Sequence, residues 1–300
     1  MTSEPGSAGT VAPRVVLGGI GDEAAPGLER QLSALRRLGW TQLELRSIDG
    51  VPLADLPDDA FARAAEAIAR AGVTVPCVDA RIGNYSRSVA TPLETDLAEL
   101  DVLGERCAAL GCRFVRIMSY PNAGLPEPEW EREVLRRVRR LAVRAERAGV
   151  VLLHENCAGW AARDPRRMLR LLEAAESPAL RLLFDIGNGV AYGYRALDLL
   201  PALGPHVAHV HVKDALGDTE RQRYTLPGDG DCDVADCLRR LYDGGYTGVL
   251  SIEPHLNIRP HDGWRDPSGD YVDSFVAYGR RLEELLATDV LPQLTAVGEE

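Results

Sequence analysis

The stretch HVAHVHVKDALGD, residues 206–218, alternates apolar and polar side chains in its first half. Such alternation is typical of a β-strand, and it places His209, His211 and Lys213 on one face. Because burying an unpaired charge costs several kcal/mol or more, two imidazoles and an ammonium on an otherwise apolar strand need polar partners. The stretch therefore predicts a buried strand that ends at a functional site and is followed by a polar loop.

The same succession of a short apolar run and a helical pattern occurs on both sides of this stretch. The other expected strands are residues 14–20, 41–48, 73–83, 112–120, 150–156, 180–188 and 248–255. The expected helices are residues 25–39, 58–72, 91–111, 127–149, 164–176, 195–203, 233–245 and 270–287. Eight strand–helix units in about 280 residues match a (β/α)8 barrel in count and length. The sequence therefore predicts a single α/β TIM barrel over residues 14–300.

An open, doubly wound sheet is the main alternative fold. Such sheets usually carry a G-x-G-x-x-G phosphate turn after the first strand. Here the corresponding stretch, GGIGDEA at residues 18–24, lacks that spacing and continues with an acidic pair. No internal domain boundary is apparent. Residues 1–13 are small and polar, without the pattern of a signal peptide, and are expected to form a disordered tail.

Composition narrows the class of protein. The chain has 300 residues and a net charge of −11, which argues against a surface built for nucleic acid. Its six cysteines form no C-x-x-C pair, which favours reduced, buried thiols and a cytoplasmic location. No apolar run reaches the roughly 18 to 20 residues needed to cross a membrane.

Each expected strand from the fifth to the eighth ends in a side chain that can bind a metal. These residues are Glu155, Asp185, His211 and Glu253. Any one of them alone reads most simply as an ion-pair partner or a core residue. A closed barrel would bring all four together at the carboxyl ends of its strands. Three carboxylates there repel one another unless a cation lies between them. The set predicts one divalent cation, with Mn²⁺ preferred, Mg²⁺ or Co²⁺ close to it, and Zn²⁺ as a further option.

Other polar residues near these strand ends are candidates for binding substrate. They are Asn188, Lys213, Arg223, Arg46, Asn156 and Trp160. Arg46 has a second interpretation as the ion-pair partner of Glu44, and Trp160 as a packing residue. His209 is expected to hold a carboxylate ligand by a hydrogen bond. The polar segment 214–232, which carries Arg221 and Arg223, is expected to be a lid-like loop or else a solvated surface loop.

The ordered set of four strand-end residues resembles the xylose-isomerase-like sugar phosphate isomerase/epimerase superfamily. GDEAAPGLERQLSALRRLGWTQLELR (21–46) and LPGDGDCD (226–233) add to a similarity that spans about residues 14–287. The resemblance implies a divalent-metal-dependent isomerase or epimerase that forms an enediolate from a small polyhydroxylated ketose or sugar derivative. It assigns proton transfer to Glu155 and Glu253, and it implies a possible homodimer, with neither nucleic acid nor membrane as a partner.

Two departures from the ketose 3-epimerases of this superfamily put the reaction in doubt. Asn188 stands where those enzymes carry a histidine, and Gly217 stands near the place of an arginine. An amide can bind a hydroxyl but cannot relay a proton. A metal-dependent dehydratase (a lyase) of an inosose or keto-sugar is therefore the alternative. A barrel that binds metal without turnover and an apurinic-type endonuclease are less favoured, the latter because its additional histidines are missing.

Overall fold

The computed structural model describes residues 14–259, 263–267 and 270–296. The expected tail at residues 1–13 lies outside the described residues. Eight parallel strands form one sheet: β1 (Val16–Ile20), β2 (Gln42–Glu44), β5 (Cys77–Asp79), β6 (Phe114–Ser119), β7 (Val151–Gly159), β8 (Leu180–Asp185), β9 (Val207–Val212) and β12 (Val249–Ile252). Their order is β2-β1-β12-β9-β8-β7-β6-β5, and bridges from Gln42 to Thr74 and from Leu45 to Val78 join its two ends. The predicted TIM barrel is confirmed.

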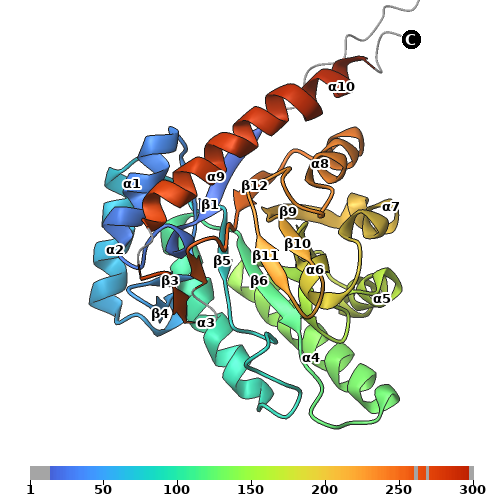
Figure 1. Ribbon diagram of the computed structural model, residues 1–300. Helices are drawn as coiled ribbons and strands as arrows, with labels where there is room; N and C mark the ends of the chain where they lie inside the picture. Colours follow the sequence, from blue (N-terminus) through green and yellow to red (C-terminus); the bar gives the residue numbers. More distant parts are fainter. Residues whose placement is uncertain (1–13, 260–262, 268–269, 297–300) are drawn as a thin grey trace, which may run out of the picture.

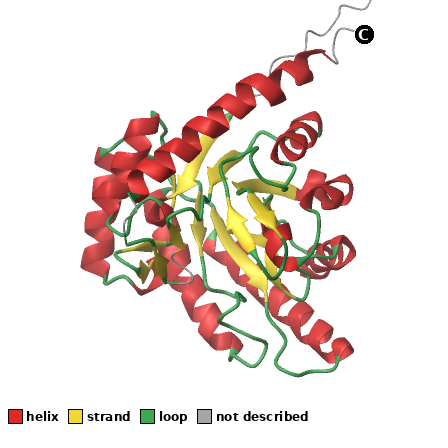
Figure 2. Ribbon diagram, in the orientation of Figure 1, coloured by secondary structure: helices red, strands yellow, loops and turns green. Residues whose placement is uncertain are grey.

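Helices surround these strands (Figures 1 and 2). They are α1 (Leu28–Leu38), α2 (Asp58–Arg70), α3 (Leu93–Leu110), α4 (Glu127–Ala148), α5 (Pro165–Ala175), α6 (Asn188–Tyr192), α7 (Leu200–Leu203), α8 (Val234–Asp243), α9 (Tyr271–Leu285) and α10 (Leu291–Ala296). Helix α1 shows the common pattern, because Leu32, Leu35 and Leu38 face the sheet at helical spacing. It ends at Gly39, whose φ of 74° is the left-handed conformation that glycine adopts without steric cost.

The inside of the barrel changes from apolar to polar along the strands. Leu153 and Leu183 pack together with Cys77 and Val151 in a small apolar cluster. Because strand side chains alternate, Glu155 and Asp185 share a face with Leu153 and Leu183, one step nearer the carboxyl end. The large core, by contrast, lies between the sheet and the helices. The inside of the barrel therefore has an apolar layer beneath a layer of polar side chains, the polar floor, at the carboxyl ends of the strands.

Three short antiparallel ribbons, which the sequence did not predict, extend this frame. They are β3–β4 (Ser47–Ile48 and Val51–Pro52), β10–β11 (Ala215–Gly217 and Gln222–Tyr224) and β13–β14 (Ile258–Arg259 and Trp264–Arg265). The second lies within the segment expected to be a lid-like loop. Its closure over a substrate stays a prediction.

Asp214 anchors that segment from inside the protein. Its side chain is fully buried, and its two oxygens accept hydrogen bonds from the backbone N–H groups of Ala215, Gly228, Gly230 and Cys232 at 2.8 to 3.2 Å. One carboxylate thus holds both ends of the segment. This explains why a stretch so rich in glycine and polar residues has a defined path.

Replacing Asp214 with asparagine is expected to lower the free energy of unfolding by about 2–4 kcal/mol. The amide nitrogen would face two backbone N–H donors, and each buried group left without a partner costs about 1–3 kcal/mol. Urea unfolding measures the change. Asp218→Asn is the matched control, because Asp218 is exposed and accepts bonds only within its own turn. Equal stability losses in the two variants would contradict the role of Asp214.

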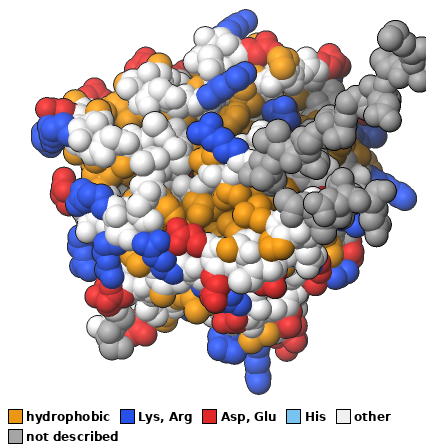
Figure 3. Space-filling model, turned by 90° about the horizontal axis from the view of Figure 1, so that it is seen from above, with side chains coloured by type: hydrophobic (Ala, Val, Ile, Leu, Met, Phe, Trp, Pro, Cys, Tyr) orange, Lys and Arg blue, Asp and Glu red, His pale blue; other side chains and the backbone are white. Residues whose placement is uncertain are grey.

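None of the described helices is long and apolar enough to cross a membrane. All six cysteines are buried and carry free thiols. On the face shown in Figure 3, acidic and basic side chains are interspersed around apolar patches, and no continuous basic stripe is visible.

Candidate functional site

The structure brings the four predicted ligands together. Glu155 lies within β7, Asp185 ends β8, His211 lies in β9, and Glu253 directly follows β12. All four are buried, and one ligand atom from each lies within 4.8 Å of the others. Asp185 and His211 are register partners on neighbouring strands, which places them at the same height in the barrel.

His211 points its Nδ1 atom at the three carboxylates. That nitrogen lies 3.9 Å from Glu155 Oε1, 3.8 Å from Asp185 Oδ2 and 3.6 Å from Glu253 Oε2. It has no hydrogen-bond partner among the described residues. Two ligands held about 2.1 Å from one ion lie ~3–4 Å apart. The donor atoms therefore fit a divalent cation, and the cluster is a candidate metal site.

Asp185 is oriented toward this point by the backbone. Its Oδ1 atom accepts hydrogen bonds from the N–H groups of Gly187 and Asn188, both at 2.7 Å, which leaves Oδ2 facing the cluster. Lys213 Nζ lies 3.0 Å from Asp185 Oδ2 and 2.6 Å from Glu253 Oε2. The ammonium thus already offsets part of the negative charge on the floor.

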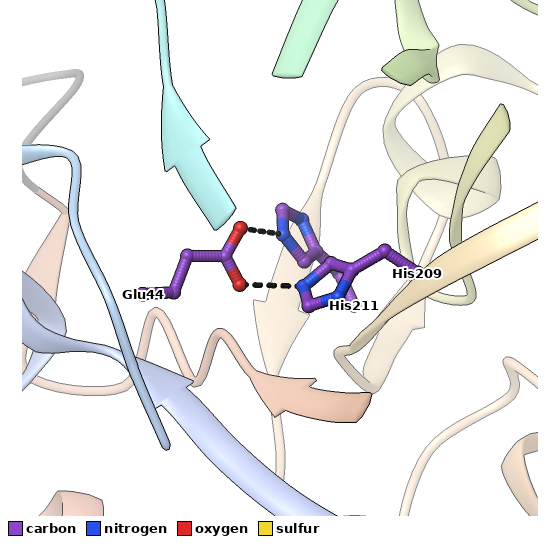
Figure 4. A group of neighbouring side chains, drawn as sticks. All are labelled: Glu44, His209 and His211. Atoms are coloured by element: carbon purple, nitrogen blue, oxygen red, sulfur yellow. Dashed lines mark hydrogen bonds and ion pairs between the residues drawn. The ribbon is translucent and has the colours of Figure 1, made fainter. Parts of the chain in front are cut away.

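Glu44, at the end of β2, holds the two histidines of β9 from across the barrel (Figure 4). Its carboxylate lies 2.7 Å from His209 Nε2 and 2.9 Å from His211 Nε2, and all three side chains are buried. His209 therefore holds a carboxylate, but the prediction that it holds one of the four metal ligands is wrong, because Glu44 lies outside the four-residue cluster.

The negative charge of Glu44 and the positive charges of the two histidines stabilise each other. Burial raises the pKa of the Glu44 carboxyl, but His209 and His211 outweigh it and hold that pKa well below its ordinary range. Burial likewise disfavours the imidazolium of His211, yet the Glu44 carboxylate raises its pKa to about 10. Because only a neutral imidazole can bind a metal, a cation in the cluster would displace the proton from His211 Nδ1, while Nε2 would keep its proton for the bond to Glu44.

Each of the two cluster glutamates also contacts an arginine, the partly exposed Arg46 in one case and the buried Arg116 in the other. Arg46 Nη1 lies 2.7 Å from Glu253 Oε1, and the same guanidinium binds Asp22 and Glu23. Arg116 Nε lies 3.4 Å from Glu155 Oε2. The prediction that Arg46 pairs with Glu44 is wrong. Because the chain turns into a ribbon after β2, Arg46 reaches Glu253 instead, whereas Glu44 stays inside the barrel.

Among the described residues, three other groups of acidic, histidine or cysteine side chains lie close enough together to hold a metal. They are Glu44 with His209 and His211, Glu23 with Glu253 and His255, and Glu44 with Cys77 and Asp79. In the first, Glu44 is already bonded to both histidines. In the second, Arg46 neutralises both carboxylates, and in the third, Arg116 Nε lies 3.2 Å from Asp79 Oδ1. The four-residue cluster is therefore the stronger candidate.

A cavity of about 1120 Å³ opens above this floor. Among the predicted substrate-binding residues, Asn188, Lys213 and Arg46 line it, together with Glu155 and Glu253. Asn188 Nδ2 donates to Glu155 Oε1 at 2.8 Å, and its Oδ1 accepts from Lys213 Nζ at 3.1 Å. The Asn188 amide therefore connects the carboxylate of Glu155 on β7 to the ammonium of Lys213, which directly follows β9.

The structure does not place Asn156, Trp160 or Arg223 on the cavity. Asn156 follows the inward-facing Glu155 and so points outward, where it exchanges two hydrogen bonds with the backbone of Asp185. The buried Trp160 donates to Glu127 and packs under a guanidinium. Arg223 lies on β11 between two residues that do line the cavity, and strand alternation turns it away.

Sequence reasoning missed Arg116, Asp79 and the pair Glu23 and His255. Arg116 is a charge inside the apolar run FVRIMSY (114–120), which was an available signal for a buried ion pair. His255 N and Nδ1 both lie 3.0 Å from Glu23 oxygens. The acidic pair of GGIGDEA, Asp22 and Glu23, thus binds side chains at the floor of the cavity, Arg46 for both and His255 for Glu23.

The comparison with known families agrees with this geometry. Residues 32–269 match the family described as xylose isomerase-like TIM barrel. The chain belongs to that family. An inosose dehydratase from Clostridium perfringens is 28% identical over 144 residues, which cover 43% of this chain and 48% of the relative. The rhizopine catabolism protein MocC of Rhizobium meliloti is 29% identical over 197 residues, 56% of this chain and 59% of the relative. The chain thus matches only about half the length of these curated relatives.

Solved structures share the fold over nearly their whole length. An L-ribulose 3-epimerase has a TM-score of 0.75 at 18% identity, covering 96% of this chain and 99% of that one. A protein titled IOLI, solved with a bound zinc atom, has a TM-score of 0.74 at 16% identity, covering 92% and 99%. At these identities the likeness shows the fold alone. This fold agrees with the family match.

Proposed function

We propose that this protein is a divalent-metal-dependent dehydratase of an inosose or keto-sugar. The observation that carries the proposal is the floor of the cavity, where Glu155 and Glu253 lie beside Asp185 and His211. The similarity to inosose dehydratases supports the choice of reaction. Glu155, Asp185, His211 and Glu253 would hold the metal, and the identity of that metal is part of the test.

The reaction begins with loss of the proton next to a ketone. A divalent cation at this site would supply Lewis-acid polarisation of the carbonyl and offset the negative charge of the enolate. Glu155 or Glu253 takes the proton. Lys213 and Arg46, which line the same floor, are placed to bind substrate oxygens. Asn188 fixes Glu155 by its hydrogen bond and cannot relay a proton itself.

The fate of that proton separates the two candidate functions. If the protonated glutamate delivers it to the hydroxyl on the next carbon, that C–O bond breaks as the carbonyl re-forms, water leaves and an enone remains, which is a dehydration. If the proton returns to carbon on the other face or at the next carbon, the reaction is an epimerisation or isomerisation. The presence of two glutamates on one floor is the observation that keeps isomerase and epimerase activity as the second candidate.

Incubation of the Mn²⁺-loaded protein with a panel of inososes and ketoses in deuterated buffer tests the proposal. NMR is expected to show loss of water and a new enone or diketone from at least one compound. Deuterium gained at carbon without loss of water would instead establish the isomerase or epimerase. If no compound exchanges a proton under any of Mn²⁺, Mg²⁺, Co²⁺ and Zn²⁺, both functions are contradicted.

A further inference from the structure

The cavity is larger than the proposed chemistry requires. Its volume of about 1120 Å³ exceeds the ~300–1,000 Å³ typical of small-molecule sites. The reacting carbonyl would occupy the floor, between Glu155 and Glu253. The outer part is lined by residues of the two ribbons β10–β11 and β13–β14. A substrate therefore has room for a substituent that reaches these ribbons.

The ribbons bring an excess of positive charge to this outer part. Arg221, Arg259 and Arg265 line the cavity there, and Glu220 is the only carboxylate among the described residues of these segments that lines it. On the floor, by contrast, Arg46, Arg116 and Lys213 are all paired with carboxylates. Arg221 and Arg265 make no ion pair with any residue that the structure describes, which is notable in a chain with a net charge of −11.

Arg259 is held in place by an aromatic ring from each ribbon. Its guanidinium carbon lies 4.2 Å from the ring centre of Trp264 on β14 and 5.8 Å from that of Tyr224 on β11. Contacts of this kind stabilise a cation and restrict its orientation before a ligand arrives. The outer part of the cavity thus has one preorganised guanidinium and two that have no counter-ion within the part of the chain that the structure describes.

We infer that the substrate carries an oxyanion, a carboxylate or a phosphoryl group, at the end remote from the reacting carbonyl. The planar guanidinium fork matches both groups with paired, charge-assisted hydrogen bonds. This inference rests on the proposed function for the orientation of the substrate, and it narrows the substrate class to an anionic keto-sugar. Arg259, whose guanidinium contacts two aromatic rings, supplies one contact to the oxyanion, and Arg221 and Arg265 supply the others.

Equilibrium binding to the Mn²⁺-loaded protein tests the inference with three probes: D-fructose, D-fructose 6-phosphate and D-fructuronate. At low ionic strength, at least one anionic probe is expected to bind about tenfold or more tightly than D-fructose, and to lose this advantage as salt rises. The preferred probe distinguishes a phosphoryl group from a carboxylate. In the double variant Arg221→Gln/Arg265→Gln, the anionic and neutral probes are expected to bind within about twofold of each other.

Arg223→Gln is the matched control, because Arg223 has the same charge and lies on the same ribbon but does not line the cavity. It is expected to keep the full preference. Equal binding of neutral and anionic probes by the wild-type protein, failure of both anionic probes to bind, or an equal loss in Arg223→Gln would overturn the inference. Binding is measured without turnover, so the two proposals can fail separately. If the protein prefers the anionic probe but never releases water from any compound, the dehydratase function is contradicted and the inference of an anionic substrate stands.

Discussion

Replacing Glu253 with glutamine is expected to lower kcat by about a thousandfold while the protein still binds Mn²⁺. A positioned general base contributes about 10²–10⁴ in rate, and glutamine cannot accept the proton. The substitution keeps the shape of the side chain but only one acceptor oxygen, so only one of the contacts with Arg46 at 2.7 Å and Lys213 at 2.6 Å can remain, because an amide NH2 group cannot accept a hydrogen bond from the other. Initial rates on the compound that turns over, followed by NMR, measure the loss.

Metal content must be determined on the same preparations, because loss of the ion would also abolish turnover. Glu155→Gln is expected to behave like Glu253→Gln. Glu105→Gln, which changes an exposed carboxylate on α3, is the control and is expected to keep its rate within about twofold. A fully loaded Glu253→Gln protein that retains a tenth or more of the wild-type kcat would show that this carboxylate is not an essential base.

The four-residue cluster could be predicted because each of its members follows an apolar run. Periodicity locates the end of a strand, and a closed barrel then places all such ends at one rim. The outward position of Asn156 was predictable on the same ground, since it follows the inward-facing Glu155 by one residue. The error arose from treating nearness in sequence as nearness in space.

Other parts of the site could not be derived from one sequence. Glu44 contacts His209 and His211, which lie 165 and 167 residues further along the chain. Only closure of the barrel brings them together. The ribbons that carry Arg221 and Arg259 have strands of two or three residues, too short for any periodic pattern to show. On such short strands the sequence does not show which of two nearby residues faces the cavity. Arg223 was predicted to bind substrate, but Arg221 is the one that lines the cavity.

Replacing Glu44 with glutamine is expected to weaken Mn²⁺ binding by about 10- to 100-fold, the range typical of residues that orient a metal ligand. Glu44 accepts hydrogen bonds from two histidines, whereas a glutamine amide offers one acceptor and one donor group. One histidine must then accept from the amide at Nε2 and carry its own proton on Nδ1. If that histidine is His211, the proton occupies the nitrogen that faces Asp185 and Glu253.

Titration of chelator-stripped protein with Mn²⁺ measures the affinity directly, without an activity assay. Asp96→Asn is the matched control, because it also converts a fully buried, hydrogen-bonded carboxylate to an amide, but Asp96 pairs with Arg87 and Tyr120 away from the cluster. It is expected to lower the free energy of unfolding and leave Mn²⁺ affinity unchanged. Equal loss of affinity in both variants would mean that general destabilisation, and not the orientation of His211, controls the metal site. Unchanged affinity in Glu44→Gln would mean that the cluster holds its ion without support from β2.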